Sequence, residues 1–450
     1  MPAVPVPPPP LLASHAAVRA ASAAASHSRR ARLAGDKPPQ VGALRRGDWV
    51  KLICGASFED AADVRNLSLV YTLAGVISPI QHTKLDGIHL RITDSSVFAV
   101  DCIDCAADAS VVGAVNEGID VATLIVPAVQ RPWVMVSVND DCRDLHFRKA
   151  EFDPEDCPLD CPKPCEKVCP ADAISLERVS VGGDHTRSDP LHGKYEGGVI
   201  TERCYGCGRC LPVCPYDRIR AVSYVRDPTM TSELLKRNDV DAIEIHTTGK
   251  GTDMFNTLWD SLSGAINNVK LVAVSLPDIG KSTVDFMNAI YTIMEPHFQG
   301  YNLWQLDGRP MSGDIGRGAT RETVSFAVRM ASMSDRPPGF YQLAGGTNSY
   351  TIDCLKKADL FQSITLPGTA TSQTIRSRQA LIGGIAYGGY ARKIVGRTLR
   401  KVPVQFGCVR IEDHPDHLLE ALEEALSLVG PVKGYISSSS KPIMRQADRP

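Results

Sequence analysis

Three runs decide the fold: DAIEIH (Asp241–His246), KLVAVSL (Lys270–Leu276) and NLWQLD (Asn302–Asp307). Each is short and rich in apolar residues, and each is followed by a loop and then an amphipathic stretch. Apolar runs that alternate with helical segments are typical of parallel strands whose two faces are both covered. The three runs therefore predict an α/β fold built on a parallel sheet.

Five further runs extend the same pattern along the chain in both directions. They are Trp49–Gly55, Cys102–Ala106, Trp133–Val138, Gly339–Leu343 and Ser363–Leu366. Eight strand–helix units are the number that closes a (β/α)8 barrel, so we predict a barrel. An open, doubly wound sheet is the alternative, because hydrophobic periodicity does not report whether a sheet closes.

Capping signals locate several of the helices. Asp108 or Ser110 is suited to cap a helix that ends at Gly118, because glycine commonly follows a helix C-terminus. Thr320 or Arg321 is expected to open another helix, with Glu322 in its first turn, where the helix dipole favours a carboxylate. Residues 372–400 are expected to be a long helical segment, in which two Gly-Gly pairs predict a kink or close packing.

Insertions and terminal segments surround the barrel units. The expected organisation is residues 1–40 as a transit peptide or disordered segment, 45–141 and 226–402 as barrel units, 142–225 as a cysteine-rich insertion, 403–436 as a strand and helix, and 437–450 as a disordered tail. Residues 76–100 interrupt the first barrel units at a helix-to-strand turn, where connections of about two to six residues are usual. Three interpretations of this interruption are an ordered excursion, a flexible loop and sequence that the mature message lacks.

Composition excludes several classes of protein. The 450 residues are 43% hydrophobic and 22% charged, which is ordinary for a globular chain and excludes one that is largely disordered. Basic residues (49) nearly balance acidic ones (51), so no basic field is present that would hold nucleic acid. No run of 18 apolar residues occurs, so the sequence predicts no transmembrane segment.

The first 35 residues contain no Asp or Glu but include Arg19, Arg29, Arg30 and Arg32 among many Ala and Ser residues. Acid-poor segments with Arg and Ser are typical of organelle transit peptides. The richness in Pro and Ser, without a clear amphipathic Arg helix, favours the chloroplast stroma, with the mitochondrial matrix as the alternative. A disordered tail without a targeting role is the other interpretation.

The cysteines are unevenly placed. The chain has 14, and eight of them fall between Cys157 and Cys214, which predicts a metal or cluster site and not a disulfide framework. The run CYGCGRCLPVCP (residues 204–215) has the spacing of a bacterial-type [4Fe–4S] ferredoxin motif, including the final proline. Structural zinc suits this run less well, since zinc sites rarely show four cysteines at that spacing.

An earlier run, CPLDCPKPCEKVCP (residues 157–170), ends in the same way but spaces its first cysteines one residue wider. In two-cluster ferredoxins the fourth cysteine of each run ligates the other cluster. We therefore expect two [4Fe–4S] clusters with these ligands: Cys157, Cys161, Cys165 and Cys214 for the first, and Cys204, Cys207, Cys210 and Cys169 for the second. Residues 174–181 are expected to form a strand that pairs with residues 219–224.

Four runs resemble the light-dependent-period (LdpA) family of cyanobacteria and its plant homologues. They are CPLDCPKPCEKVCPADAI (157–174), CYGCGRCLPVCPYDRI (204–219), IEIHTTGKGT (243–252) and LWQLDGRPMSGDIGRGAT (303–320). Many proteins share ferredoxin motifs, so the two later runs make the resemblance specific. The resemblance implies an iron–sulfur protein that reports or relays photosynthetic redox state, in cyanobacteria to the circadian clock. Residues 76–100 depart from the family pattern.

Two further sites are candidates. Loops after the later strands are rich in glycine, and barrels often bind phosphate there through backbone N–H groups. The residues expected to hold a flavin or another phosphorylated ligand are Arg309, Arg317, Gly345, Gly346, Thr347, Gly368 and Thr369. Tight turns in an empty barrel are the alternative. Cys54, Cys105 and Cys142 fall at or just after the ends of the first three strands and could form a third metal site, although free Cys is usually a small buried apolar residue.

These features predict an iron–sulfur protein that acts as an electron relay or redox sensor in the plastid, with protein redox or signalling partners. A ferredoxin-coupled oxidoreductase, with flavin or a phosphorylated ligand in its barrel, is the alternative. A third interpretation makes the clusters purely structural. No catalytic residues are identified, and His246 at the end of its strand is either a ligand-facing group or a structural histidine.

Overall fold

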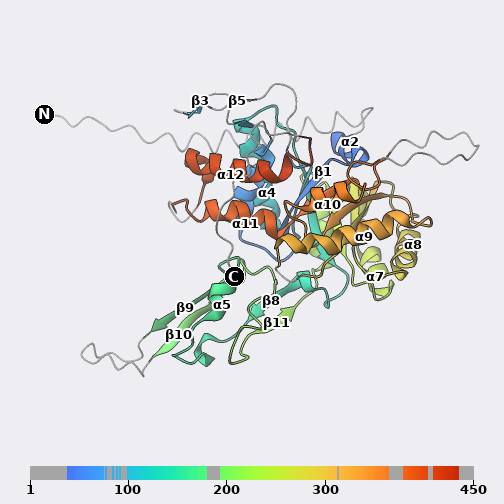
Figure 1. The fold of residues 1–450 in the computed structure, drawn as a ribbon. Coiled ribbons are helices and arrows are strands. Elements are labelled where there is room, and N and C mark those ends of the chain that lie inside the picture. The colour runs from blue at the N-terminus through green and yellow to red at the C-terminus, as the bar shows by residue number, and fades with distance from the viewer. Residues whose placement is uncertain are drawn as a thin grey trace, which may run out of the picture.

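A closed barrel of parallel strands forms the centre of the computed structural model (Figure 1). The structure describes residues 38–75, 77–78, 84–85, 88–89, 91–92, 99–179, 193–311, 314–363, 379–403 and 409–434. Around the barrel the eight strands follow the order β1, β16, β15, β14, β13, β12, β7, β6, and β1 pairs with both β16 and β6. The predicted barrel is confirmed, and the open sheet is excluded.

Seven of the eight predicted runs coincide with barrel strands. The strands are β1 (Trp49–Gly55), β6 (Cys102–Ala106), β7 (Trp133–Asn139), β12 (Ala242–His246), β13 (Leu271–Pro277), β14 (Tyr301–Asp307), β15 (Phe340–Ala344) and β16 (Gly384–Tyr387). The surrounding helices are α2 (Pro39–Arg46), α3 (Ala61–Leu73), α4 (Ala109–Ile125), α6 (Pro228–Leu235), α7 (Asp253–Leu262), α8 (Ser282–Met294), α9 (Thr320–Ser332), α10 (Thr351–Lys357), α11 (Gly389–Leu399) and α12 (Pro415–Val429).

The prediction of the eighth strand was wrong. The eighth position in the barrel is taken by Gly384–Tyr387, and most of the predicted run Ser363–Leu366 lies outside the described residues. Gly384 pairs with Trp49 of β1, and a Cβ atom at Gly384 would lie 2.3 Å from the Trp49 carbonyl oxygen. Gly384, one of the glycines that predicted a kinked helix, therefore serves the close approach of two strands, and the second pair, Gly388-Gly389, lies at the start of α11.

Helix starts were predicted better than helix ends. Asp108 caps α4, since its carboxylate accepts hydrogen bonds from the backbone N–H groups of Ser110 (2.8 Å) and Val111 (3.1 Å). α9 begins at Thr320, as predicted. α4 continues past Gly118, however, to Ile125. A Cβ atom at Gly118 would lie 2.3 Å from the Arg65 carbonyl oxygen of α3, so this glycine permits two helices to pack closely.

Several predicted segments fall partly outside the described residues. In the interval 76–100, two pairs of short antiparallel strands are described: β2 (Ile77–Ser78) with β5 (Arg91–Ile92), and β3 (Lys84–Leu85) with β4 (Ile88–His89). Residues 1–37 of the expected transit peptide or disordered segment, residues 404–408 of the expected strand and helix (403–436) and the expected tail (437–450) lie outside, whereas α2 begins at Pro39, inside the span 1–40. Among the described helices, none is long and apolar enough to cross a membrane.

Two glycines of α4 allow the close packing of α3 and α4 to be tested. Gly118→Ala should lower the free energy of unfolding by about 1–3 kcal/mol, because the added methyl group meets the α3 backbone. The matched control is Gly113→Ala in the same helix, where a Cβ atom would meet nothing within 4 Å. There, the higher helix propensity of alanine should stabilise the fold by about 0.5–1 kcal/mol. Urea unfolding followed by circular dichroism measures both; equal effects of the two substitutions would contradict this account.

Candidate metal centre

The cysteine-rich insertion follows β7 and forms a module of two antiparallel strand pairs beside the barrel (Figure 1). Its elements are β8 (Arg148–Glu151), α5 (Pro164–Val168), β9 (Ile174–Val179), β10 (Lys194–Val199) and β11 (Arg220–Ser223). β9 pairs with β10, and β11 pairs with β8. The predicted pairing of residues 174–181 with 219–224 was therefore wrong, because each of these two strands has a different partner.

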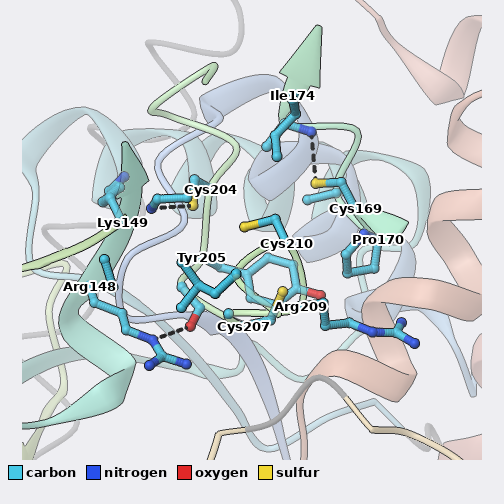
Figure 2. Close-up of a pocket in the computed structure, with 17 residues that line it drawn as sticks. Arg148, Lys149, Cys169, Pro170, Ile174, Cys204, Tyr205, Cys207, Arg209 and Cys210 are labelled. Carbon is cyan, nitrogen blue, oxygen red and sulfur yellow. Dashed lines mark hydrogen bonds between the residues drawn. The ribbon is translucent and has the colours of Figure 1, made fainter. Parts of the chain in front are cut away.

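The structure gathers the eight cysteines into two groups. Each group contains three cysteines of one run and the last cysteine of the other run. Burial raises the pKa of the Cys157 thiol, and the neighbouring thiols that add to this effect are Cys161, Cys165 and Cys214. Burial also raises the pKa of Cys210 to about 12, with further contributions from Cys207, Cys204 and Cys169. Figure 2 shows the second group around one pocket. Cys214 and Cys169 are thus exchanged between the runs, which is the arrangement that crossed ligation requires.

Backbone N–H groups point at three of these sulfur atoms. The N–H of Ala173 donates to Cys169 Sγ (3.2 Å), that of Ala150 to Cys204 Sγ (3.3 Å) and that of Arg218 to Cys214 Sγ (3.4 Å). Such hydrogen bonds favour thiolate sulfur and tune the potential of iron–sulfur clusters. The described donor set, soft thiols that receive N–H hydrogen bonds, fits iron–sulfur clusters.

Two glycines shape the loop of the second run. Gly206 and Gly208 have φ angles of 74° and 73°, which side chains rarely adopt. A Cβ atom at Gly206 would lie 2.4 Å from the Arg148 carbonyl oxygen, and one at Gly208 would lie 2.4 Å from Nη2 of Arg148. Arg148 Nε in turn donates to the Gly206 carbonyl oxygen at 2.7 Å (Figure 2). The loop is therefore held against β8 in a conformation that only small residues permit.

Apolar packing encloses the thiols. The buried core of the module consists of Cys165, Ile174, Leu176, Tyr195, Cys210 and Ile219. Tyr216, close to Cys161 and Cys214, is 40% exposed. An exposed side chain therefore lies beside the first cysteine group, of which Cys161 and Cys165 are buried and Cys157 and Cys214 partly exposed.

Ion pairs fix the module to the barrel. Glu59, in the loop before α3, accepts from Lys149 (3.0 Å) and from Arg226 (2.7 Å). Asp60 accepts from Arg203 at 2.9 Å. The two carboxylates thus contact the module at three places. These are Lys149 in β8, Arg203 just before the second cysteine run, and Arg226 where the chain leaves the module.

Tyr205 lies between the second cysteine group and the barrel. Its ring lines both the cysteine pocket and the pocket at the barrel mouth. The guanidinium group of Arg392, on α11, lies 3.8 Å from the centre of the Tyr205 ring and donates to the Cys54 carbonyl oxygen at 2.9 Å. The Tyr205 ring also meets Phe58 edge-on, with ring centres 6.4 Å apart. Tyr205, the residue next to Cys204, is therefore held against the barrel by both contacts.

The structure brings part of the predicted phosphate site together. Arg309, Gly345, Gly346 and Thr347 all line the pocket at the barrel mouth. Arg317 instead lies over the ring of Tyr350, 4.4 Å from its centre. Gly368 and Thr369 lie outside the described residues. Flavin or phosphate binding at this pocket stays a prediction.

The three cysteines considered for a third metal site do not assemble into one. Cys54 and Cys105 are fully buried, whereas Cys142 is exposed. Burial raises the pKa of Cys54 to about 12, and that of Cys105 well above its ordinary value. The two buried thiols are protonated at neutral pH and pack as small apolar groups.

Sequence reasoning missed a charged network inside the barrel. Lys51 of β1 is fully buried and forms ion pairs with Glu244 of β12 and, at 3.6 Å, with Asp104 of β6. Burial alone would lower the pKa of Lys51, but the two carboxylates outweigh it and raise that pKa. Burial raises the pKa of Asp104 to about 6. The available signal was the presence of Lys51, Asp104 and Glu244 within strands predicted to be buried on both faces.

Comparisons with known proteins agree with this architecture. Residues 157–225 match the family model described as the LdpA Fe-S cluster-binding domain, and residues 234–431 match the Light dependent period A C-terminal domain. The chain is also similar to the Light dependent period A protein of Synechococcus elongatus, with 36% identity over 404 residues, which covers 89% of this chain and 96% of that protein. The chain is therefore an iron–sulfur protein that belongs to the light dependent period A family.

Proposed function

We propose that the module holds two [4Fe–4S] clusters with crossed ligands and serves as an electron relay or redox sensor. The observation that carries the proposal is the exchange of Cys169 and Cys214 between the two cysteine groups. Eight thiols in two quartets match the ligand demand of two cubes, and the exchange keeps the cubes close together. A short distance between the two clusters favours electron transfer from one cluster to the other.

The two cysteine groups face different surroundings, and this difference suggests a direction for the electrons. The first group lies near exposed Tyr216, where a protein partner can approach. The second lies behind Tyr205, whose ring also lines the barrel mouth. A cluster at the first group would exchange electrons with an external protein, and a cluster at the second would communicate with the barrel.

Pairs of cysteine substitutions distinguish crossed from uncrossed ligation. With crossed ligands, Cys165→Ser/Cys214→Ser damages one cluster and should retain about half of the iron and acid-labile sulfide. Cys165→Ser/Cys169→Ser damages both clusters and should lose nearly all cubane iron. Uncrossed ligation predicts the opposite order. Iron and sulfide analysis with Mössbauer spectroscopy on anaerobically purified protein measures the outcome, and the matched control is Cys354→Ser, outside both groups.

A second candidate function is a ferredoxin-coupled oxidoreductase. The favouring observation is that Tyr205, beside Cys204, lines the same pocket as Arg309, Gly345, Gly346 and Thr347. A flavin bound there would receive electrons from the second cluster and pass them to a substrate. The residues present supply an arginine and a glycine-rich loop, both of which suit a phosphate group.

Flavin release separates the two candidate functions. An oxidoreductase of this kind should release flavin on denaturation of the anaerobically purified protein, and Arg309→Ala should lower the amount released because it removes one of the two arginines, Arg309 and Arg392, that line the pocket. Arg317→Ala, which changes an arginine outside the pocket, is the control. Clusters that bleach reversibly on reduction, in protein without flavin, would instead support the relay or sensor.

We also infer that the protein acts in the chloroplast stroma. The acid-poor, Arg- and Ser-containing composition of residues 1–35 supports this location. Residues 1–40 fused to a fluorescent protein should be imported by isolated chloroplasts and shortened in the process. Replacing the four arginines of the segment by Glu should abolish import, whereas replacing them by Lys preserves the charge and serves as the control. Import by mitochondria alone would contradict this location.

A further inference from the structure

Two histidines and an aspartate converge at the mouth of the barrel, outside the two cysteine groups. Asp144 and His146 follow β7, and His246 is the last residue of β12. Each can offer one ligand atom, and the three atoms lie within 4.8 Å of one another. The side chains of Asp144 and His246 are only 7% exposed. Neighbouring barrel strands therefore bring together residue types that bind transition metals, without any sequence motif to signal it.

Two atoms of this cluster are buried without a hydrogen-bond partner. His246 Nε2 lies 3.1 Å from Glu244 Oε1. With the ring proton on Nε2, the lone pair of His246 Nδ1 would face Asp144 Oδ2 at 3.3 Å, and neither of these two atoms makes a hydrogen bond. Two buried acceptors in that position require a cation or a proton between them.

The third residue faces the same carboxylate. His146 Nδ1 lies 2.8 Å from Asp144 Oδ1, and the rings of His146 and His246 have centres 4.9 Å apart. Both histidines line the pocket at the barrel mouth, so that a ligand could reach them from solvent. The cluster is therefore buried behind an open cavity.

The surrounding charges favour a cation. Buried Asp104 and Glu244 and partly buried Asp307 lie in or next to this part of the barrel, and Lys51 is the buried cation paired with the first two. Asp307 hydrogen-bonds to Ser275 and lines the same pocket as the histidines. Arg309 and Arg392 also line the pocket. With Asp144 added, carboxylates outnumber the buried cation Lys51, and a dication next to Asp144 would offset part of this negative charge.

We infer that Asp144, His146 and His246 form a binding site for one divalent first-row transition metal. Two imidazole nitrogens and one carboxylate oxygen are a common ligand set for catalytic zinc and for non-haem iron(II). Glu244 is placed to orient His246 from behind, as carboxylates do in many metal sites. The remaining coordination positions would face the barrel cavity, where water or a chelating substrate binds. Binding displaces the proton shared by His146 and Asp144 to solvent.

Zinc provides the test, because its ligand shell distinguishes this site from the cysteines. Protein with assembled iron–sulfur clusters is equilibrated with zinc, desalted and analysed for both metals, and X-ray absorption at the zinc edge identifies the ligands. We expect about one zinc per chain with nitrogen and oxygen ligands at about 2.0–2.1 Å, whereas zinc in the cysteine module would show sulfur at about 2.3 Å.

Substitutions then assign the site. Asp144→Asn, His146→Gln and His246→Gln should each lower zinc affinity at least tenfold while the iron content stays unchanged. The matched control is Asp141→Asn, since Asp141 is a nearby buried carboxylate paired with Arg143. Wild-type protein that takes up no zinc, or zinc with a sulfur shell only, overturns the inference, and this result does not depend on whether any variant folds. Nitrogen-ligated zinc that survives all three substitutions also overturns it.

Discussion

The buried ion pair of Lys51 and Glu244 is the interaction around which the barrel interior is arranged. A charged amine without access to water is tolerated only where carboxylates and hydrogen bonds compensate it. Glu244 also accepts from Gln305 (2.5 Å), Gln305 accepts from Gln342 (2.7 Å), and Gln342 accepts from the Trp49 indole (2.9 Å). Glu244 further contacts His246 at the mouth. One carboxylate therefore links β1, β12, β14 and β15 and connects the apolar base of the barrel to its open end.

The position of the insertion determines what the cysteine module can reach. Chain segments that follow barrel strands collect at one end of the barrel, where ligands usually bind. The module leaves after β7, returns before α6, and is held by Glu59 and Asp60 of the first barrel unit. Tyr205 therefore lies at a boundary, with cysteine thiols on one side and the barrel cavity on the other. The module is built into the mouth of the barrel and is not a separate appendage.

Sequence predicted those parts of the molecule that depend on local spacing. Seven strands were identified because each is an apolar run, and the cysteine quartets because their spacing is specific. The eighth strand was missed because its glycine is required by contact with Trp49, which is distant in sequence. β8 gave no signal, since its residues are polar or only partly buried. β11 was expected within residues 219–224, but its partner is β8 and not the predicted strand. The convergence of Asp144, His146 and His246 exists only once β7 and β12 lie side by side, so no window of sequence contains it.

The route of the chain through this fold has a consequence for its biogenesis. All eight cysteines of the module precede β12 in the chain, whereas β16, which closes the barrel against β1, comes much later. Arg392, which covers the Tyr205 ring, follows β16. Part of the barrel-side wall of the second run is therefore supplied by a segment far downstream, which is in place only once the last barrel unit has docked. Until that unit docks during folding, we expect the second run to be open to iron and sulfide on its barrel side.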